Sequence, residues 1–222
     1  RLERFRGRSI VRKAVILGAG GHCRVILSIL FAGRWYKDLE IIDLATPKQG
    51  EIIMGIPVAP GSDELPHLPD RDDIDVFLAI GDNDMRRQWW CKLTEFGLSM
   101  PNLVSPHAVI DDSADLGDSN VICARAFIGP MVKLGKNDLI NTGVILEHEA
   151  RVGNHCHLAP SVTVSGRSRL EDGCFVGAGA TILDGISVAG KTIIGAGATL
   201  TRSVESPGGV YVGVPALRKE NS

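Results

Sequence analysis

The chain has 222 residues, of which 44% are hydrophobic, and its formal net charge is −2. This size accommodates one large domain or two modest ones with a buried core. The charge gives no electrostatic reason to expect binding to nucleic acid or to a membrane surface. No run approaches the roughly 18 apolar residues of a membrane-spanning helix. The five cysteines form no CxxC pair and are odd in number, which predicts reduced thiols and a cytoplasmic protein.

The first ten residues are rich in arginine and lack the apolar stretch that a signal peptide needs. We expect residues 1–10 to form a tail or linker. Because the sequence starts at Arg1 rather than at a methionine, we also expect it to begin inside a longer chain or after processing.

The first half of the chain alternates short apolar runs with helical patterns. The run Val11–Leu17 leads into the glycine-rich turn Gly18–His22, and a helical pattern follows. Further strands are predicted at Glu40–Leu44 and Asp75–Ile80, and a second helix over Asn83–Phe96. Strand, glycine turn, helix and strand in this order predict a Rossmann-like α/β domain with a ligand at the carboxyl ends of its parallel strands.

The second half follows a different rule, because every sixth residue is aliphatic. A period of six fits neither a helix of 3.6 residues per turn nor the alternation of a strand, whereas it fits a solenoid built from hexads. With three hexads to a triangular coil, the ladder predicts about five coils. The ladder residues are Ile110, Leu116, Ile122, Ile128, Leu134, Ile140, Leu146, Val152, Leu158, Val164, Leu170, Val176, Ile182, Val188, Ile194 and Leu200.

Two smaller patterns repeat with this ladder. The residue two positions before a ladder residue is usually small or apolar, as an inward position near a tight corner demands. A glycine directly follows many ladder residues, and we expect positive φ there. These glycines are Gly117, Gly129, Gly135, Gly153, Gly177 and Gly195.

The patterns divide the chain into four parts. After the tail of residues 1–10, we expect the α/β domain over residues 11–100 and the hexapeptide-repeat β-helix over residues 107–205. Residues 206–222 are expected to form a C-terminal tail. The join between the two domains is predicted between Gly97 and His107.

Four motifs occur along the chain in this order: GAGGH (18–22), IGDNDMRRQ (80–88), INTGVILEHE (140–149) and YVGVPA (211–216). Together they resemble bacterial hexapeptide-repeat sugar acetyltransferases. This family includes the sialic-acid O-acetyltransferase-like group and the UDP-4-amino-sugar N-acetyltransferases of bacillosamine-type pathways. The resemblance implies a nucleotide-sugar-binding α/β domain, a left-handed parallel β-helix, acetyl-CoA as co-substrate and a homotrimer with sites between subunits.

His148 and Glu149 fall at a predicted turn, where polar residues also occur for purely structural reasons. His148 lies between two carboxylates in the sequence, Glu147 and Glu149, and a carboxylate partner orients an imidazole and raises its basicity. Acetyl transfer from a thioester needs a base to take the proton of the attacking amine or hydroxyl, which contributes about 10²–10⁴-fold. The resemblance implies that His148 is the general base and Glu149 its orienting acid.

Asn141 and His157 are further candidates. The resemblance implies that Asn141 lies at the active site and that His157 lies near the acyl donor, where the developing oxyanion needs a donor. From the residues alone, Asn141 is equally expected as a turn residue and His157 as a solvent-facing strand residue.

A zinc site is the alternative that the histidines raise. Hexapeptide-repeat carbonic anhydrases bind zinc through three histidines of neighbouring subunits, and His148, His155 and His157 offer three. Because these fall at different hexad offsets, we expect no metal.

The remaining site residues follow from the resemblance and the glycine turns. In the family, acetyl-CoA lies along the outside of the late coils, which implies donor contacts from His157, Gly166, Gly177, Ala178, Gly195 and Ala196. The glycine turn offers backbone N–H groups to a diphosphate, and Cys23 replaces the third glycine of a dinucleotide fingerprint, which disfavours a redox cofactor. The implied nucleotide-sugar contacts are Gly20, Gly21, His22, Asp43 and Gly81.

The sequence therefore predicts an acetyl-CoA-dependent N-acetyltransferase that acts on the amino group of a UDP-4-amino-4,6-dideoxy sugar or a similar nucleotide sugar. O-acetylation of a sialic-acid-like sugar shares every motif and remains open. Two other classes also remain: a catalytically silent nucleotide-sugar-binding scaffold, and a zinc hydrolase that holds stoichiometric metal.

Overall fold

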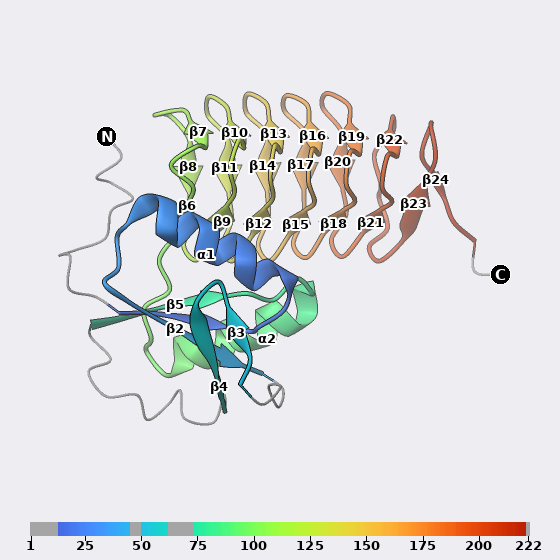
Figure 1. Cartoon of the computed structure of the whole chain (residues 1–222). Helices are drawn as coiled ribbons and strands as arrows, with labels where there is room; N and C mark the ends of the chain where they lie inside the picture. The colour runs from blue at the N-terminus through green and yellow to red at the C-terminus, as the bar shows by residue number, and fades with distance from the viewer. Residues whose placement is uncertain (1–12, 45–49, 62–72, 221–222) are drawn as a thin grey trace. The chain divides into compact units, whose positions relative to one another are not determined.

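The computed structural model of the chain describes residues 13–44, 50–61 and 73–220. The chain divides into two compact units, Arg1–Pro106 and His107–Ser222 (Figure 1). The tail expected at residues 1–10 lies outside the described residues, as do the first two residues of the run predicted at Val11–Leu17.

The first unit contains a five-stranded sheet in the order β3-β4-β2-β1-β5. Strand β1 pairs in parallel with β2 and β5, and β4 pairs in parallel with β2, so the predicted α/β class is confirmed. The elements are β1 (Lys13–Leu17), α1 (Gly21–Gly33), β2 (Asp38–Asp43), β3 (Ile52–Ile53), β4 (Ile56–Pro60), β5 (Ile74–Leu78) and α2 (Asn83–Glu95).

The central strands and both helices bury the core of this unit. Residues 14–17 and 74–78 are buried throughout, as expected of parallel strands covered on both faces. Helix α1 packs on β1 and α2 packs on β5. Helix α2 begins after Asp82, whose Oδ1 accepts a hydrogen bond of 2.8 Å from the backbone N–H of Met85.

The hairpin of β3 and β4 was not predicted from the sequence. Met54 and Gly55 connect its strands with φ values of 48° and 88°, the positive values that tight hairpin turns require. Strand β3 has only two residues, and β4 carries Pro57 and Pro60, so neither strand gives a clear alternation.

The second unit is a parallel β-solenoid in which every third strand belongs to the same face (Figure 1). The first face consists of β7 (Val109–Ile110), β10 (Phe127–Ile128), β13 (Ile145–Leu146), β16 (Thr163–Val164), β19 (Thr181–Ile182) and β22 (Thr199–Leu200). The second consists of β8 (Asp115–Leu116), β11 (Lys133–Leu134), β14 (Arg151–Val152), β17 (Arg169–Leu170) and β20 (Ser187–Val188). The third contains β9 (Val121–Ile122), β12 (Leu139–Ile140), β15 (His157–Leu158), β18 (Phe175–Val176), β21 (Ile193–Ile194) and β23 (Val210–Val212).

Two further strands lie in the segments that were expected as the join and as the tail. Strand β6 (Leu103–Val104) belongs to the segment predicted as the join. Residues 206–222, expected as a tail, contain β23, which extends the third face in parallel with β21, and β24 (Leu217–Arg218), which pairs antiparallel with β23.

Four-residue corners connect the faces and are named here for use below. The first corner, between the first and second faces, contains residues 147–150 and the equivalent positions 18 residues away, such as 165–168 and 183–186. The second corner contains 135–138, 153–156 and their equivalents, and the third corner contains 141–144, 177–180 and 195–198.

The aliphatic ladder forms the interior of the solenoid as predicted. Every ladder residue is the second residue of one of the strands β7 to β22, and those from Ile122 to Leu200 are at most 4% exposed. Ile110 and Leu116, in the first coil, are only half-buried. Four polar residues take the inward position two before the ladder: Asn120, Asp138, Ser168 and Thr192. Asn120 and Asp138 each accept a hydrogen bond from a backbone N–H of the next coil, which satisfies them inside the core.

The prediction of positive φ at the glycines after the ladder is wrong. Positive φ occurs three residues after a ladder residue instead, for example at Gly143 and Gly179. The predicted glycines are needed for close approach between coils: a Cβ on Gly135 would stand 2.5 Å from the carbonyl oxygen of Gly153. The reason for glycine at these positions is therefore steric contact between coils, not backbone torsion.

Within the described ranges, no helix combines the length and the apolar character that crossing a membrane requires.

Candidate active site

His148 and Glu149 lie next to each other at the first corner, between β13 and β14. The Nδ1 atom of His148 is 3.3 Å from Oε2 of Glu149, and both side chains are 50% exposed. Glu149 adopts a left-handed conformation with φ of 60°, as do Met131 and Arg167 at the equivalent positions of the adjacent coils. When Nδ1–H donates a hydrogen bond to Glu149, Nε2 carries the lone pair that accepts a proton.

The imidazole of His148 lies directly on Gly166, one coil further along. A Cβ on Gly166 would stand 2.5 Å from both Cε1 and Nε2 of His148. Any side chain at this position would therefore force the ring to move. Gly166 was predicted as a donor contact, and the structure places it beside the candidate base, where it determines the position of the ring.

An ion pair of Arg167 and Asp184 completes this corner. Nη2 of Arg167 pairs with Oδ2 of Asp184. The hydrogen bond and the charge of Asp184, with a smaller contribution from Glu149, raise the pKa of Arg167 above its ordinary value. Oδ1 of Asp184 lies 3.1 Å from the position of a Cβ on Gly166, the same point that Nε2 of His148 approaches. Neither Arg167 nor Asp184 was predicted, although the 18-residue period places both in register with the His148–Glu149 turn.

Asn141 and His157 lie on other parts of the solenoid. Asn141 is at the third corner, where its Oδ1 accepts a hydrogen bond of 2.8 Å from the backbone N–H of Thr142. His157 is on β15, and its ring stacks edge-to-face on Phe175 with 5.0 Å between centroids. In a three-sided coil the first corner is opposite the third face. One chain therefore brings His148, Glu149 and Gly166 together, but not Asn141 and His157.

The other predicted donor residues line the third corner. Ala178 and Ala196 are exposed there, one coil apart. A Cβ on Gly177 would stand 2.5 Å from the backbone nitrogen of Ala196, and one on Gly195 would stand 2.8 Å from Cγ1 of Val212. Contact with the neighbouring residues is therefore sufficient to explain both glycines, and the exposed alanines leave an unobstructed strip on the outside.

The predicted nucleotide-sugar residues gather at one edge of the first unit. The turn after β1, Asp43 at the end of β2 and Gly81 after β5 all lie at the carboxyl ends of parallel strands. Helix α1 starts at Gly21 with no side-chain cap, and half-buried His22 follows in its first turn. Among the described residues, and apart from the chain next to each glycine, no heavy atom lies within 4 Å of where a Cβ would stand on Gly20, Gly21 or Gly81. This edge thus offers a helix N-terminus whose glycines are not crowded by the other described residues, which suits an anionic group.

The buried Arg86 stabilises the loop after β5 at this edge. It was not predicted as a functional residue from the sequence. It is 3% exposed, and its Nη1 donates to the carbonyl oxygens of Ile80 and Gly81, each at 3.3 Å. Its Nη2 donates to Oδ1 of Asn83 at 2.9 Å. The run IGDNDMRRQ therefore contains a buried arginine that fixes the loop carrying Gly81.

Comparisons with known proteins agree with this geometry. Residues 13–93 match the family described as the PglD N-terminal domain. Over 94% of its length, the chain is similar to a histidine-to-asparagine variant of perosamine N-acetyltransferase from Caulobacter crescentus in complex with CoA and GDP-perosamine. The identity is 30%, the TM-score is 0.88, and 97% of that chain is covered. None of the curated protein sequences compared with the chain matches it.

A second relative supports the same assignment. The acetyltransferase domain of PglB from Neisseria gonorrhoeae, in complex with acetyl coenzyme A, is 28% identical with a TM-score of 0.87. The match covers 94% of this chain and 100% of that one. WeeI from Acinetobacter baumannii AYE, at 21% identity and a TM-score of 0.67, shares the fold.

The chain belongs to the bacterial sugar acetyltransferases. It is accordingly an acetyltransferase, and its solenoid is the left-handed parallel β-helix that the motifs implied. The resemblance stated from the four motifs is confirmed.

The histidines considered for zinc are dispersed over this acetyltransferase. His148 is at the first corner, His157 is on the third face, and His155 is at the second corner, where its Nδ1 lies 2.9 Å from Nδ2 of Asn137. In the part of the chain that the structure describes, no group of three or more His, Cys, Asp or Glu side chains could hold a metal ion.

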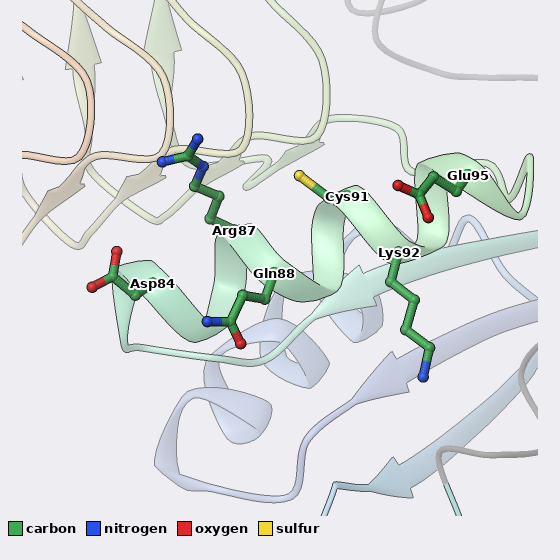
Figure 2. A pocket seen from close by; sticks show the side chains of 6 residues that line it. All are labelled: Asp84, Arg87, Gln88, Cys91, Lys92 and Glu95. Atoms are coloured by element: carbon green, nitrogen blue, oxygen red, sulfur yellow. The ribbon is translucent and has the colours of Figure 1, made fainter.

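A pocket lies along α2, outside the predicted site residues. Figure 2 shows Arg87 and Cys91 extending from one side of the helix and Lys92 from another. The Nζ atom of Lys92 is 4.6 Å from the ring centroid of Trp89, so this charge is in part engaged by its own helix. Helix α2 alone supplies the side chains described around the pocket, which are Asp84, Arg87, Gln88, Cys91, Lys92 and Glu95.

Proposed function

We propose that this acetyltransferase transfers acetyl from acetyl-CoA to the amino group of a nucleotide-linked 4-amino-4,6-dideoxy sugar. The observation that carries the proposal is the His148 ring, which is seated on Gly166 with Nδ1 toward Glu149. The relatives support the substrate classes, because one is solved with CoA and GDP-perosamine and another with acetyl coenzyme A.

In the proposed mechanism His148 is the general base and Glu149 orients it. The amine attacks the thioester carbonyl directly, and Nε2 of His148 accepts the proton that nitrogen loses. Glu149 accepts the Nδ1 hydrogen bond, which fixes the ring and stabilises the imidazolium as it forms. A base of this kind contributes about 10²–10⁴-fold to the rate.

Asn141 and His157 are proposed to act at the acyl group or acceptor from a neighbouring subunit. Within one chain they lie on a different corner and on the opposite face from His148. A homotrimer would let the first corner of one chain meet these residues of the next, because a three-sided prism packs well around a three-fold axis. In this arrangement acetyl-CoA would follow the strip of Ala178 and Ala196.

The nucleotide end of the substrate is proposed to bind at the carboxyl edge of the first unit. The open N-terminus of α1 at Gly20, Gly21 and His22 suits a diphosphate, and Asp43 suits hydrogen-bond donors of the nucleoside. Gly81, fixed by Arg86, completes the edge.

Thiol release from acetyl-CoA tests the proposal when measured across UDP- and GDP-linked amino sugars, their hydroxyl counterparts and sialic acids. We expect release with an amino sugar, and a product heavier by one acetyl group at the amine. Release with hydroxyl acceptors alone would replace the proposal by O-acetylation. No release with any acceptor would favour a silent nucleotide-sugar-binding scaffold.

A further inference from the structure

We propose that Asp184 binds the substrate's amine, as its ammonium, at the reacting side of His148. This inference rests on the proposed function and deepens it, because it makes an amine that binds as its ammonium and loses a proton before attack the preferred acceptor. The proposal starts from three charged side chains at the first corner that belong to three successive coils: Glu149, Arg167 and Asp184.

The two carboxylates lie near different nitrogen atoms of the imidazole. Glu149 lies at Nδ1, at 3.3 Å. Near Nε2, Oδ1 of Asp184 lies 3.1 Å from the position of a Cβ on Gly166, and Nε2 itself lies 2.5 Å from that same point. An amine that reaches Nε2 therefore arrives beside the Asp184 carboxylate.

Arg167 orients this carboxylate without neutralising the corner. Its Nη2 pairs with Oδ2 of Asp184, which leaves Oδ1 as the oxygen directed at Gly166. Two carboxylates surround one guanidinium here, so the three side chains carry one net negative charge. A bound ammonium would balance that charge, and its hydrogen bond to Oδ1 would be charge-assisted. A neutral hydroxyl acceptor would gain much less from this position.

The chemistry explains the use of such a group. An ammonium and acetyl-CoA react to an amide, the CoA thiol and one proton. The N–C bond forms and the C–S bond breaks; nitrogen loses two protons, of which one ends on the leaving thiolate and the other passes through His148 to solvent. Asp184 holds the ammonium until its first proton leaves, which places nitrogen at the base before attack.

An ordinary surface ion pair is the competing interpretation of Arg167 and Asp184, since exposed pairs contribute little to stability. The chain contains a matched pair at the second corner, where Nζ of Lys136 lies 3.7 Å from Oδ2 of Asp118, again in adjacent coils. Asp118→Asn therefore removes the same kind of carboxylate at a distance from His148.

The test measures kcat/KM of wild type, Asp184→Asn and Asp118→Asn with the best nucleotide amino sugar of the panel and with its hydroxyl counterpart. For Asp184→Asn we expect a loss of about 30-fold with the amine, an unchanged KM for acetyl-CoA, and little change with the hydroxyl acceptor. Asp118→Asn should match wild type with both. Asp184→Glu should restore part of the preference for the amine.

Two results would overturn the inference. One is equal loss with amine and hydroxyl acceptors, which indicates a structural role for Asp184. The other is wild-type activity of Asp184→Asn with the amine. If wild type itself releases no thiol with any amine, the proposed function fails instead, and that result is obtained before any variant is compared.

Discussion

The first and second corners of the β-helix each contain a histidine and an ion pair between adjacent coils, yet they differ in what surrounds the ring. At the first corner, the His148 ring faces the carboxylate of Glu149 and rests on Gly166, and half of the His148 side chain is exposed. At the second corner, His155 occupies the left-handed position itself, with φ of 60°, and its Nδ1 contacts the amide of Asn137. The same hexad frame therefore makes one histidine suitable for proton transfer and makes the other part of the coil-to-coil contacts.

The largest expected effect separates these two histidines. His148→Ala should lower kcat by about 10³-fold, because it removes the general base. His155→Ala should keep nearly full activity, since Asn137 remains as a turn residue. Steady-state thiol release with both substrates saturating measures this difference. Equal losses of kcat in the two variants would contradict the assignment of His148 as the general base.

Substituting Gly166 at the first corner should affect mainly activity, whereas substituting Gly135 at the second corner should affect mainly stability. Gly166→Ala pushes the His148 ring aside, and because a side chain can rotate, we expect a loss of about 10²-fold in kcat with a nearly unchanged melting temperature. Gly135→Ala would collide with the backbone of the next coil, which should cost about 1–3 kcal/mol of stability with normal activity of the folded fraction. Thermal unfolding and thiol release on the same samples test both. A fully active Gly166→Ala would contradict the site geometry.

A smaller effect is expected for the carboxylate that orients His148. Glu149→Gln keeps a hydrogen-bond acceptor but removes the charge that stabilises the imidazolium, so kcat should fall about 10-fold. Glu147→Gln is the control, because the structure pairs the ring with Glu149. If Glu147→Gln lost more activity than Glu149→Gln, the orienting acid would have been assigned to the wrong neighbour.

The smallest effect concerns the reactivity of the buried thiols. Burial raises the pKa of Cys23 to about 11 and that of Cys123 to about 12, and Cys156 and Cys174 are buried in the prism. At pH 7.5 the thiols of Cys23 and Cys123 stay protonated, and burial keeps a reagent away from Cys156 and Cys174, so native protein should react with one equivalent of a thiol reagent, at exposed Cys91. Mass spectrometry after labelling locates the adduct, and Cys91→Ser should abolish it. Fast labelling of Cys156 would show that the second corner opens.

Much of the fold follows from the sequence because its period is regular. The ladder residues predicted the strands β7 to β22, since each must face inward at the same point of a hexad, whereas β23, which extends the third face, lies in the segment expected as a tail. Glycine function was harder to predict, because a glycine that avoids contact with the next coil looks the same in the sequence as one that needs positive φ. The hairpin of β3 and β4 escaped prediction because its strands are too short to alternate.

The site was predictable only in part. His148 and Glu149 are adjacent in sequence, so their pairing was visible, whereas Asp184 lies 36 positions from His148 and approaches it only through the stacking of coils. Gly166 was predicted for the donor, and its contact with the His148 ring depends on the same 18-residue register. Asn141 and His157 remain predictions that depend on a neighbouring chain.

A double-mutant cycle of His148→Ala and Gly166→Ala tests the central claim most directly, with kcat for acetyl transfer as the readout. If Gly166 acts by leaving room for the catalytic ring, its substitution costs about 10²-fold in wild type and almost nothing once the ring is absent, so the double variant equals His148→Ala. If the two losses multiply instead, Gly166 acts independently of His148, and the assignment of this corner as a base seated on a glycine is wrong.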